Sequence, residues 1–257
     1  MQLRHHHSAV GIDSPFLRSE LLITFRGMYS DGKVGASRRP KGVQIAFNSS
    51  FEAFIQGVAA RLNPNDLEKV PAADEGMTHA AVTLLLRPAG GDAISDTGGN
   101  APGDSAEILF IKRAERAGDP WSGHIAFPGG RAEKWDATLL EIAMREAAEE
   151  VGIDARQGGR LLGRLPTMRP MSARIPSISV TPFVALAPPG AILRTQPKEV
   201  QEAFWIRIAA LKGSGRSATV RWEATEGTRE LPAFPSPKGP IWGITERILS
   251  QFLALVE

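Results

Sequence analysis

The sequence contains no cysteine, and this absence excludes several kinds of chemistry. With 0 cysteines among 257 residues, the chain has no disulfide framework, no thiolate metal ligand and no cysteine nucleophile. Any metal ion must therefore be bound by oxygen atoms or imidazole nitrogens. Long apolar runs are missing too, since no window approaches the roughly 18 apolar residues of a membrane-spanning helix. We therefore expect no membrane partner.

A strong excess of charge of either sign is missing as well. The chain holds 30 basic and 28 acidic side chains, and residues 1–45 alone carry seven basic and three acidic groups. The remaining, almost neutral body gives no reason to expect nucleic acid as a partner. Residues 1–45 also lack the apolar core and the small-residue cleavage site of a secretory signal. We expect a cytoplasmic protein with a basic, partly disordered N-terminal arm over 1–45.

The rest of the chain has the composition of a globular domain, with 42% hydrophobic and 23% charged residues. A helical period of apolar residues predicts a short helix over 50–62, which with a connector makes up an N-terminal segment over 46–75. Beyond a loop at 88–105 rich in glycine, further patterns predict strands and one last helix. The strands are predicted at 80–86, 108–112, 161–165, 178–186, 203–208, 219–224 and 228–234, and the helix at 245–256. Strands with interspersed helices indicate the α/β or α+β class.

A second helix, predicted over 136–151, has well-marked ends. Asp136 is placed to act as its N-cap, and Trp135 could pack on Leu140 as a hydrophobic staple. Gly152 follows the helix, where a residue in the left-handed conformation commonly ends it. These signals predict a helix with sharply defined ends.

The last turns of this helix are unusually acidic. Glu146, Glu149 and Glu150 stand at positions i, i+3 and i+4, where like charges destabilise a helix by about 0.2–0.5 kcal/mol per pair. Arg145 alone leaves the cluster negative, so a divalent cation with oxygen ligands is the natural complement; Mg²⁺ fits best and Mn²⁺ is an alternative. A solvated helical face is the competing interpretation. The paired glycines at 129–130 favour the metal, because they allow a phosphate to approach the backbone closely.

These residues resemble the Nudix box, whose usual form is G-x5-E-x7-R-E-U-x-E-E-x-G-U with U aliphatic. The matching residues are Gly130, Arg145, Glu146, Glu149, Glu150, Gly152 and Ile153. Asp136 replaces the first glutamate, and eight residues rather than seven separate it from Arg145. Residues 127–130, preceded by Arg113 and Gly123, and residues 241–245 are similar to motifs that accompany the box in coenzyme A pyrophosphatases.

The resemblance implies a Nudix-type α/β/α sandwich over 76–257, with a mixed curved sheet and a catalytic loop–helix–loop. It implies an enzyme that uses a divalent metal to hydrolyse a pyrophosphate bond in a small-molecule nucleoside diphosphate derivative, first of all coenzyme A or acyl-CoA. The alternatives are a nucleoside triphosphate, an ADP-sugar or a dinucleotide as substrate, or a nucleotide-binding module without catalysis. Because many relatives are dimers, the resemblance also leaves a homodimer open.

By position in the box, the resemblance gives Glu146, Glu149, Glu150 and the Gly130 carbonyl as metal ligands. It gives Arg145 as the residue that orients a ligand glutamate. The alternative for Arg145 is an ordinary surface ion pair, worth under about 1 kcal/mol.

The general base in this family comes either from the box helix, here Glu149, or from a later loop, here Glu199 or Glu202. Trp121 or Phe127 could stack on an adenine, but aromatic residues at such positions are as often part of the core. Arginine suits phosphate oxygens through its fork of donors. We therefore expect contacts to the substrate from four residues, Arg113, Arg116, Gly129 and Gly130.

Overall fold

The computed structural model describes residues 49–63, 70, 77–90, 105–170, 177–224 and 227–256. The basic arm predicted over 1–45 lies outside these residues, as do most of the connector up to residue 75 and most of the loop predicted at 88–105. Among the described helices, none has the length and apolar character needed to cross a membrane.

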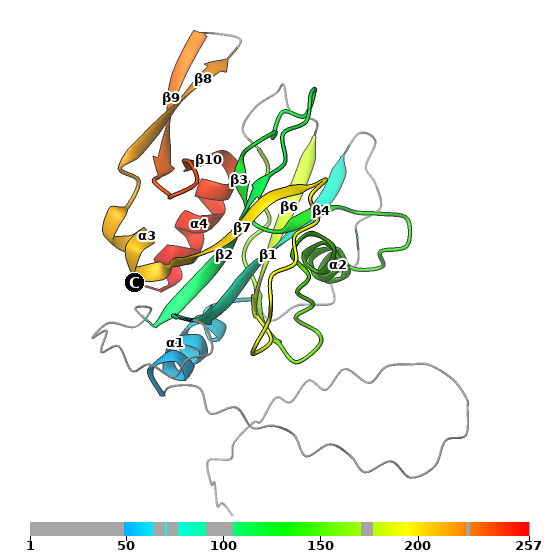
Figure 1. The fold of residues 1–257 in the computed structure, drawn as a ribbon, viewed down its shortest axis with the longest axis vertical. Helices are drawn as coiled ribbons and strands as arrows, with labels where there is room; N and C mark the ends of the chain where they lie inside the picture. The colour runs from blue at the N-terminus through cyan, green and yellow to red at the C-terminus, as the bar shows by residue number, and fades with distance from the viewer. Residues whose placement is uncertain are drawn as a thin grey trace, which may run out of the picture. The chain divides into compact units, whose positions relative to one another are not determined.

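Helices and strands follow one another in mixed order along the described chain (Figure 1). In sequence they are α1 (Ser49–Ala59), β1 (Thr78–Pro88), β2 (Ala106–Arg113), β3 (Ile125–Ala126), β4 (Gly129–Arg131), α2 (Leu139–Val151), β5 (Arg160–Arg164), β6 (Ile178–Leu186), β7 (Val200–Arg207), α3 (Ile208–Ser214), β8 (Ala218–Ala224), β9 (Gly227–Phe234), β10 (Ile241–Trp242) and α4 (Gly243–Leu255). All the predicted strands are present, with ends shifted by at most three residues. The sequence did not reveal β3, β4 and β10, because two or three residues are too few to show a period. It also did not reveal α3.

The central element is a mixed sheet of seven strands. Its order is β3-β2-β1-β6-β5, with β4 also paired to β1 and β7 also paired to β2. β1 and β6 run parallel, whereas the remaining pairs are antiparallel. β6 lies inside the sheet and is buried at all nine positions, including the polar residues Ser179 and Thr181, as expected for a strand covered on both faces. β8, β9 and β10 form a second, three-stranded sheet. The predicted mixed α/β class is therefore confirmed.

The two faces of the large sheet carry separate cores, because successive strand residues point to opposite sides. Leu84 and Leu86 of β1 pack in one cluster with residues of α1 and α4. Ala81 and Leu85 of the same strand pack in the other cluster with residues of α2. Figure 1 shows α2 apart from α1 and α4, across the strands of the sheet. The helices thus form a layer on each side, and α2 holds the acidic residues against one face.

Candidate active site

The two glycines of β4 bring the backbone unusually close to its neighbours. Gly129 and Gly130 pair with Val82 and Ala81 of β1. A Cβ atom on Gly129, whose φ is 157°, would collide with the Ala81 carbonyl, and one on Gly130 would collide with the Glu146 carboxylate. Gly129 therefore requires glycine, because the obstructing atoms there include backbone atoms. At Gly130 the same comparison shows that the carboxylate of Glu146 lies directly against β4, which we call the glycine strand.

The helix α2 begins later than the sequence predicted. Its N-cap is Thr138, whose hydroxyl accepts a hydrogen bond from the Glu141 backbone N–H, while Glu141 in turn accepts from the Thr138 N–H. The prediction of Asp136 as N-cap was therefore wrong, and so was the staple, because Trp135 is 72% exposed. The capping box at Thr138 is readable in the sequence but was overlooked. The predicted end is confirmed, since Gly152 has a left-handed φ of 73°.

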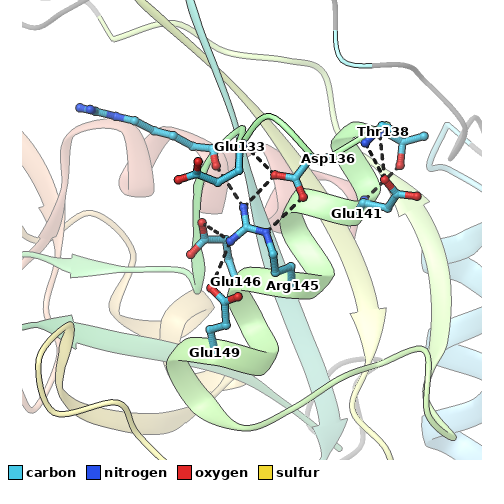
Figure 2. Close-up of polar contacts among 9 residues, drawn as sticks. Glu133, Asp136, Thr138, Glu141, Arg145, Glu146 and Glu149 are labelled. Atoms are coloured by element: carbon cyan, nitrogen blue, oxygen red, sulfur yellow. Dashed lines mark hydrogen bonds and ion pairs between the residues drawn. The ribbon is translucent and has the colours of Figure 1, made fainter.

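Asp136 instead forms a hydrogen-bonded ion pair with Arg145 (Figure 2). Arg145 donates from Nε to Asp136 Oδ1 at 3.1 Å and from Nη2 to Asp136 Oδ2 at 2.9 Å. Burial opposes ionisation of Asp136, but the hydrogen bonds and charge of Arg145 outweigh it and lower the pKa of this carboxyl. A carboxylate and a guanidinium can form such a two-pronged pair with little freedom of orientation.

The other donors of Arg145 reach the glutamates and the glycine strand. Nη1 donates to Glu146 Oε1 at 2.9 Å and to Glu149 Oε2 at 3.1 Å, and Nη2 also donates to the Arg131 carbonyl at 3.2 Å. Figure 2 shows the guanidinium between these groups. The Arg145 side chain is only 17% exposed, so an ordinary surface ion pair does not describe it. The geometry suits a residue that fixes the Glu146 carboxylate.

Glu150 is the most deeply buried acid of the helix, at 2% exposure. Its Oε2 accepts a hydrogen bond from the Gly129 N–H at 2.9 Å. Burial nevertheless raises its pKa to about 8, with the nearby Glu146 charge adding to the effect and the Gly129 hydrogen bond opposing it. Burial likewise raises the pKa of Glu146, against the influence of Arg145. A buried and a half-buried carboxylate that both resist ionisation call for a cation beside them.

A third carboxylate comes from a distant part of the chain. One oxygen each from Glu146, Glu150 and Glu199 lies within 4.8 Å of the other two. Glu199 immediately precedes β7, so the group joins α2 to the β7 edge of the site. Glu149, whose side chain is 55% exposed, pairs with Arg145 and is not a member of this group. Glu202 forms an ion pair with Lys238 at 2.6 Å.

Arg116 is hydrogen-bonded to the loop that carries Glu199. Its Nε and Nη2 donate to the Lys198 carbonyl at 3.1 and 2.5 Å, and Nη2 lies 3.7 Å from Glu199 Oε1. The Ala114 N–H donates to the Glu199 carbonyl at 2.9 Å. Arg116, which the sequence suggested as a substrate contact, is thus engaged with the protein itself. The sequence gave no sign of this link, because 82 residues separate Arg116 from Lys198.

Arg113 carries a positive charge that acts on Glu150 of the acidic group, by which we mean Glu146, Glu150 and Glu199. Its Nη2 donates to Asp119 at 3.0 Å, and its charge acts to lower the pKa of Glu150. Within the described residues, its buried Nε has no hydrogen-bond partner. Of the two candidate stacking residues, Phe127 is 2% exposed and stacks on Phe110 at 4.9 Å between ring centroids. Phe127 is therefore a core residue, whereas Trp121 is half-buried below the Arg131 guanidinium.

The acidic group has the chemistry of a cation site. Carboxylate oxygens from Glu146, Glu150 and Glu199 are the donors that hard divalent ions prefer. A bound cation would relieve the cost of ionising Glu150 and Glu146 away from water. The adjacent glycine strand leaves room at the backbone for a ligand of the same ion.

Comparison with known proteins bears directly on this site. A family model described as the NUDIX domain matches residues 98–226, which is half of the chain and includes all three acids. The chain is 29% identical over 149 residues to a Photorhabdus laumondii protein described as "Uncharacterized Nudix hydrolase NudL", a match that covers 58% of this chain and 77% of that protein. It is 37% identical over 95 residues to the Salmonella newport protein of the same description, over 37% of this chain and 47% of that protein.

Two further matches either cover a smaller share of the matched protein or have a lower sequence identity. A Schizosaccharomyces pombe protein, "Uncharacterized protein C14C4.10c", is 37% identical over 107 residues, which are 40% of this chain and 32% of that protein. The chain thus spans about a third to a half of two of these three relatives. A solved MutT/nudix family protein from Enterococcus faecalis aligns with a TM-score of 0.41 at 16% identity, over 79% of this chain and 73% of that one. By the match of the family model to the segment that carries the acidic group, the chain belongs to the Nudix family.

Proposed function

We propose that this protein is a divalent-metal-dependent hydrolase of a pyrophosphate bond in a small-molecule nucleoside diphosphate derivative. Coenzyme A or an acyl-CoA is the first substrate to test, because of the motifs at 127–130 and 241–245. We assign the activity to a domain over 76–257 that works in the cytoplasm without nucleic acid. The observation that carries the proposal is the group of Glu146, Glu150 and Glu199 beside the glycine strand.

The proposed ligands follow from burial and distance. Glu146, Glu150 and Glu199 would hold Mg²⁺ or Mn²⁺, because their oxygens lie within 4.8 Å of one another. The Gly130 carbonyl is a further proposed ligand, since Gly130 lies against the Glu146 carboxylate. When bound, the ion would neutralise charge on the diphosphate and lower the pKa of an attacking water. Arg145 would hold the Glu146 carboxylate in place through Nη1.

The remaining roles go to groups outside the ligand set. Glu149 would accept the proton of the attacking water, because its carboxylate is exposed and shares Arg145 Nη1 with Glu146. Arg113 would bind a phosphate oxygen through the accessible part of its guanidinium, since its side chain is 27% exposed. Glu202 takes no role here, since Lys238 already pairs with it. Arg116 acts on the Glu199 loop rather than on substrate.

A nucleotide-binding module without catalysis is the second candidate. It is favoured by one observation, namely that Arg116, which the sequence suggested as a substrate contact, donates to the Lys198 carbonyl instead. Such a module would bind nucleotide and metal yet release no product. A homodimer is compatible with either candidate.

Product analysis separates these candidates. The full chain would be incubated with Mg²⁺ and, separately, with coenzyme A, acetyl-CoA, ADP-ribose, NADH, a diadenosine polyphosphate and nucleoside triphosphates, and the products identified by mass spectrometry. With coenzyme A and one water consumed, we expect phosphopantetheine and adenosine bisphosphate. Cleavage of another compound would keep the hydrolase and change the substrate.

Two variants complete the experiment. Glu150→Gln keeps the size of the side chain but removes a proposed ligand, so all turnover should disappear. Glu52→Gln is the matched control, because Glu52 lies on α1 and pairs with Arg160 at 3.1 Å, away from the acidic group. Full activity in Glu150→Gln, or no turnover of any compound by folded wild-type protein that binds Mg²⁺, would contradict the proposed hydrolase.

A further inference from the structure

Three aromatic rings from separate parts of the chain contact one another in a row. The His124 ring lies 4.6 Å from the Trp242 ring, and the Trp222 ring lies 5.3 Å from the Trp242 ring, both measured between centroids. The ring planes are inclined by 54° and 50°, respectively. All three residues are half-buried, so each keeps part of its surface in contact with solvent. We call His124, Trp242 and Trp222 the aromatic row.

The backbone fixes the position of each ring. Trp242 ends β10, which pairs with β9 and contacts β3, and Trp222 lies on β8 of the same small sheet. His124 directly precedes β3, and its carbonyl accepts the Arg113 N–H at 3.0 Å. Figure 1 shows β10 beside β3, where the small sheet meets the edge of the large one. The row therefore bridges the two sheets rather than belonging to either core cluster.

Arg113 connects the aromatic row to the acidic group. The Arg113 N–H donates to the His124 carbonyl at 3.0 Å, and the N–H of the next residue, Ala114, donates to the Glu199 carbonyl at 2.9 Å. Its side chain is mostly buried, and its Nε lacks a partner within the described residues. The backbone of Arg113 and Ala114 thus links a half-exposed ring to a carboxylate residue of the acidic group, so an aromatic part and a charged part lie at the two ends of this link. A nucleoside diphosphate derivative has the same two parts, joined through a ribose.

We propose that the aromatic row is the subsite that binds the nucleobase of the substrate by stacking. This inference rests on the proposed function, because it names the second contact of the same substrate. Stacking on aromatic side chains suits any base, since each base presents a π-face. His124 and Trp222 lie within residues 98–226 that the family model matches, whereas Trp242 lies outside them.

Binding of ADP, compared with inorganic pyrophosphate, tests the subsite without relying on turnover. Calorimetric titrations in Mg²⁺ would use wild-type protein, Trp242→Ala and Trp222→Ala. We expect each variant to bind ADP about five- to a hundredfold more weakly, the range that loss of one stacking contact implies. The affinity for pyrophosphate, which has no base, should stay within twofold. Trp135→Ala is the matched control, because Trp135 is 72% exposed and lies outside the row.

A second measurement covers the case in which an alanine variant does not fold. In wild-type protein, nuclear Overhauser contacts should link the adenine H2 and H8 protons of ADP to the indole protons of Trp242 or Trp222. Trp242→Phe and Trp222→Phe would assign the signals and should retain most of the affinity. Absence of such contacts with saturating ADP, or unchanged ADP affinity in both folded alanine variants, would overturn the subsite.

The outcomes distinguish the subsite from the hydrolase itself. If ADP binding depends on the row but no substrate is cleaved, the subsite stands and the hydrolase proposal falls. If substrates are cleaved with the same KM in wild-type protein and both alanine variants, the hydrolase stands and the subsite falls.

Discussion

Glu149 and Glu150 are neighbours in sequence, yet their environments are opposite. Glu150 is 2% exposed, accepts the Gly129 N–H and has a pKa raised to about 8. Glu149 is largely exposed and pairs with Arg145 on the solvent side. Successive helix residues are about 100° apart, so one faces the sheet and the other faces away. The comparison teaches that consecutive acidic residues need not form one site. A buried and an exposed carboxylate differ in pKa and in the groups they contact, so they serve different functions.

Replacing Glu150 should have the largest effect. Glu150→Gln removes a proposed ligand, so we expect activity to fall at least about a thousandfold. At pH 8 in the presence of a metal chelator, the free energy of unfolding of this variant should exceed that of wild type by roughly 4 kcal/mol, because a pKa raised from 4.5 to about 8 costs about 1.4 kcal/mol per unit and glutamine carries no such cost. Chemical denaturation and turnover assays check both parts.

Glu149→Gln sharpens the contrast with its neighbour. It should also lower activity, by about 10²–10⁴-fold if Glu149 is the base, but it should leave stability in chelator within about 0.5 kcal/mol. Equal changes in stability for the two variants would contradict the division by burial.

Arg145→Lys tests the network that both glutamates share. Lysine keeps the charge but loses the fork that reaches Asp136, Glu146 and Glu149 together. We expect a loss of about 1–3 kcal/mol in unfolding free energy and roughly a tenfold or greater fall in activity. Arg156→Lys, in an ion pair with Asp154, is the control and should change stability by less than about 0.5 kcal/mol. If both variants changed the unfolding free energy by less than about 0.5 kcal/mol, the Arg145 network would contribute no more to stability than a surface ion pair.

Metal binding should depend on pH through the buried acid. The pKa of Glu150 in the folded protein lies near 8, above its ordinary value of 4.5. Below pH 8 a proton must leave before the cation binds, so affinity for Mg²⁺ should rise up to about tenfold per pH unit between pH 6 and 8 and then level off. Calorimetric titration measures the slope, which should be much smaller in Glu150→Gln. A flat profile in wild-type protein would contradict this account.

Arg116→Ala should have the smallest effect. Loss of its contacts to Lys198 and Glu199 would loosen the third proposed ligand, so Mn²⁺ affinity should fall by roughly three- to tenfold while stability changes by less than about 0.5 kcal/mol. Arg160→Ala, which removes the ion pair to Glu52, is the matched control and should leave Mn²⁺ affinity unchanged.

The sequence was sufficient for whatever depends on local pattern. The long strands and the Gly152 helix end follow from period and from one special residue, and the structure has both. The N-cap prediction was wrong because Asp136 and Thr138 are both good capping residues. The Asp136 carboxylate forms its hydrogen bonds with the Arg145 guanidinium rather than with the first turn of the helix, and Thr138 is therefore the N-cap.

The contacts that join distant segments could not be read in the same way. Glu199 was one of two loop acids, and nothing in its neighbourhood distinguishes it from Glu202 until β7 pairs with β2. The aromatic row depends on the pairing of β8, β9 and β10, which places Trp222 next to Trp242 across 20 residues of chain. Such proximity arises from sheet topology rather than from spacing.

The most direct test of the central claim is a titration of Mn²⁺ followed by electron paramagnetic resonance in wild-type protein, Glu199→Gln and Glu149→Gln. If Glu146, Glu150 and Glu199 hold the ion, Glu199→Gln should weaken binding about tenfold or more, and Glu149→Gln should bind within about twofold of wild type. Weakened binding in Glu149→Gln together with unchanged binding in Glu199→Gln would contradict the account and return the ligand set to the three glutamates of α2.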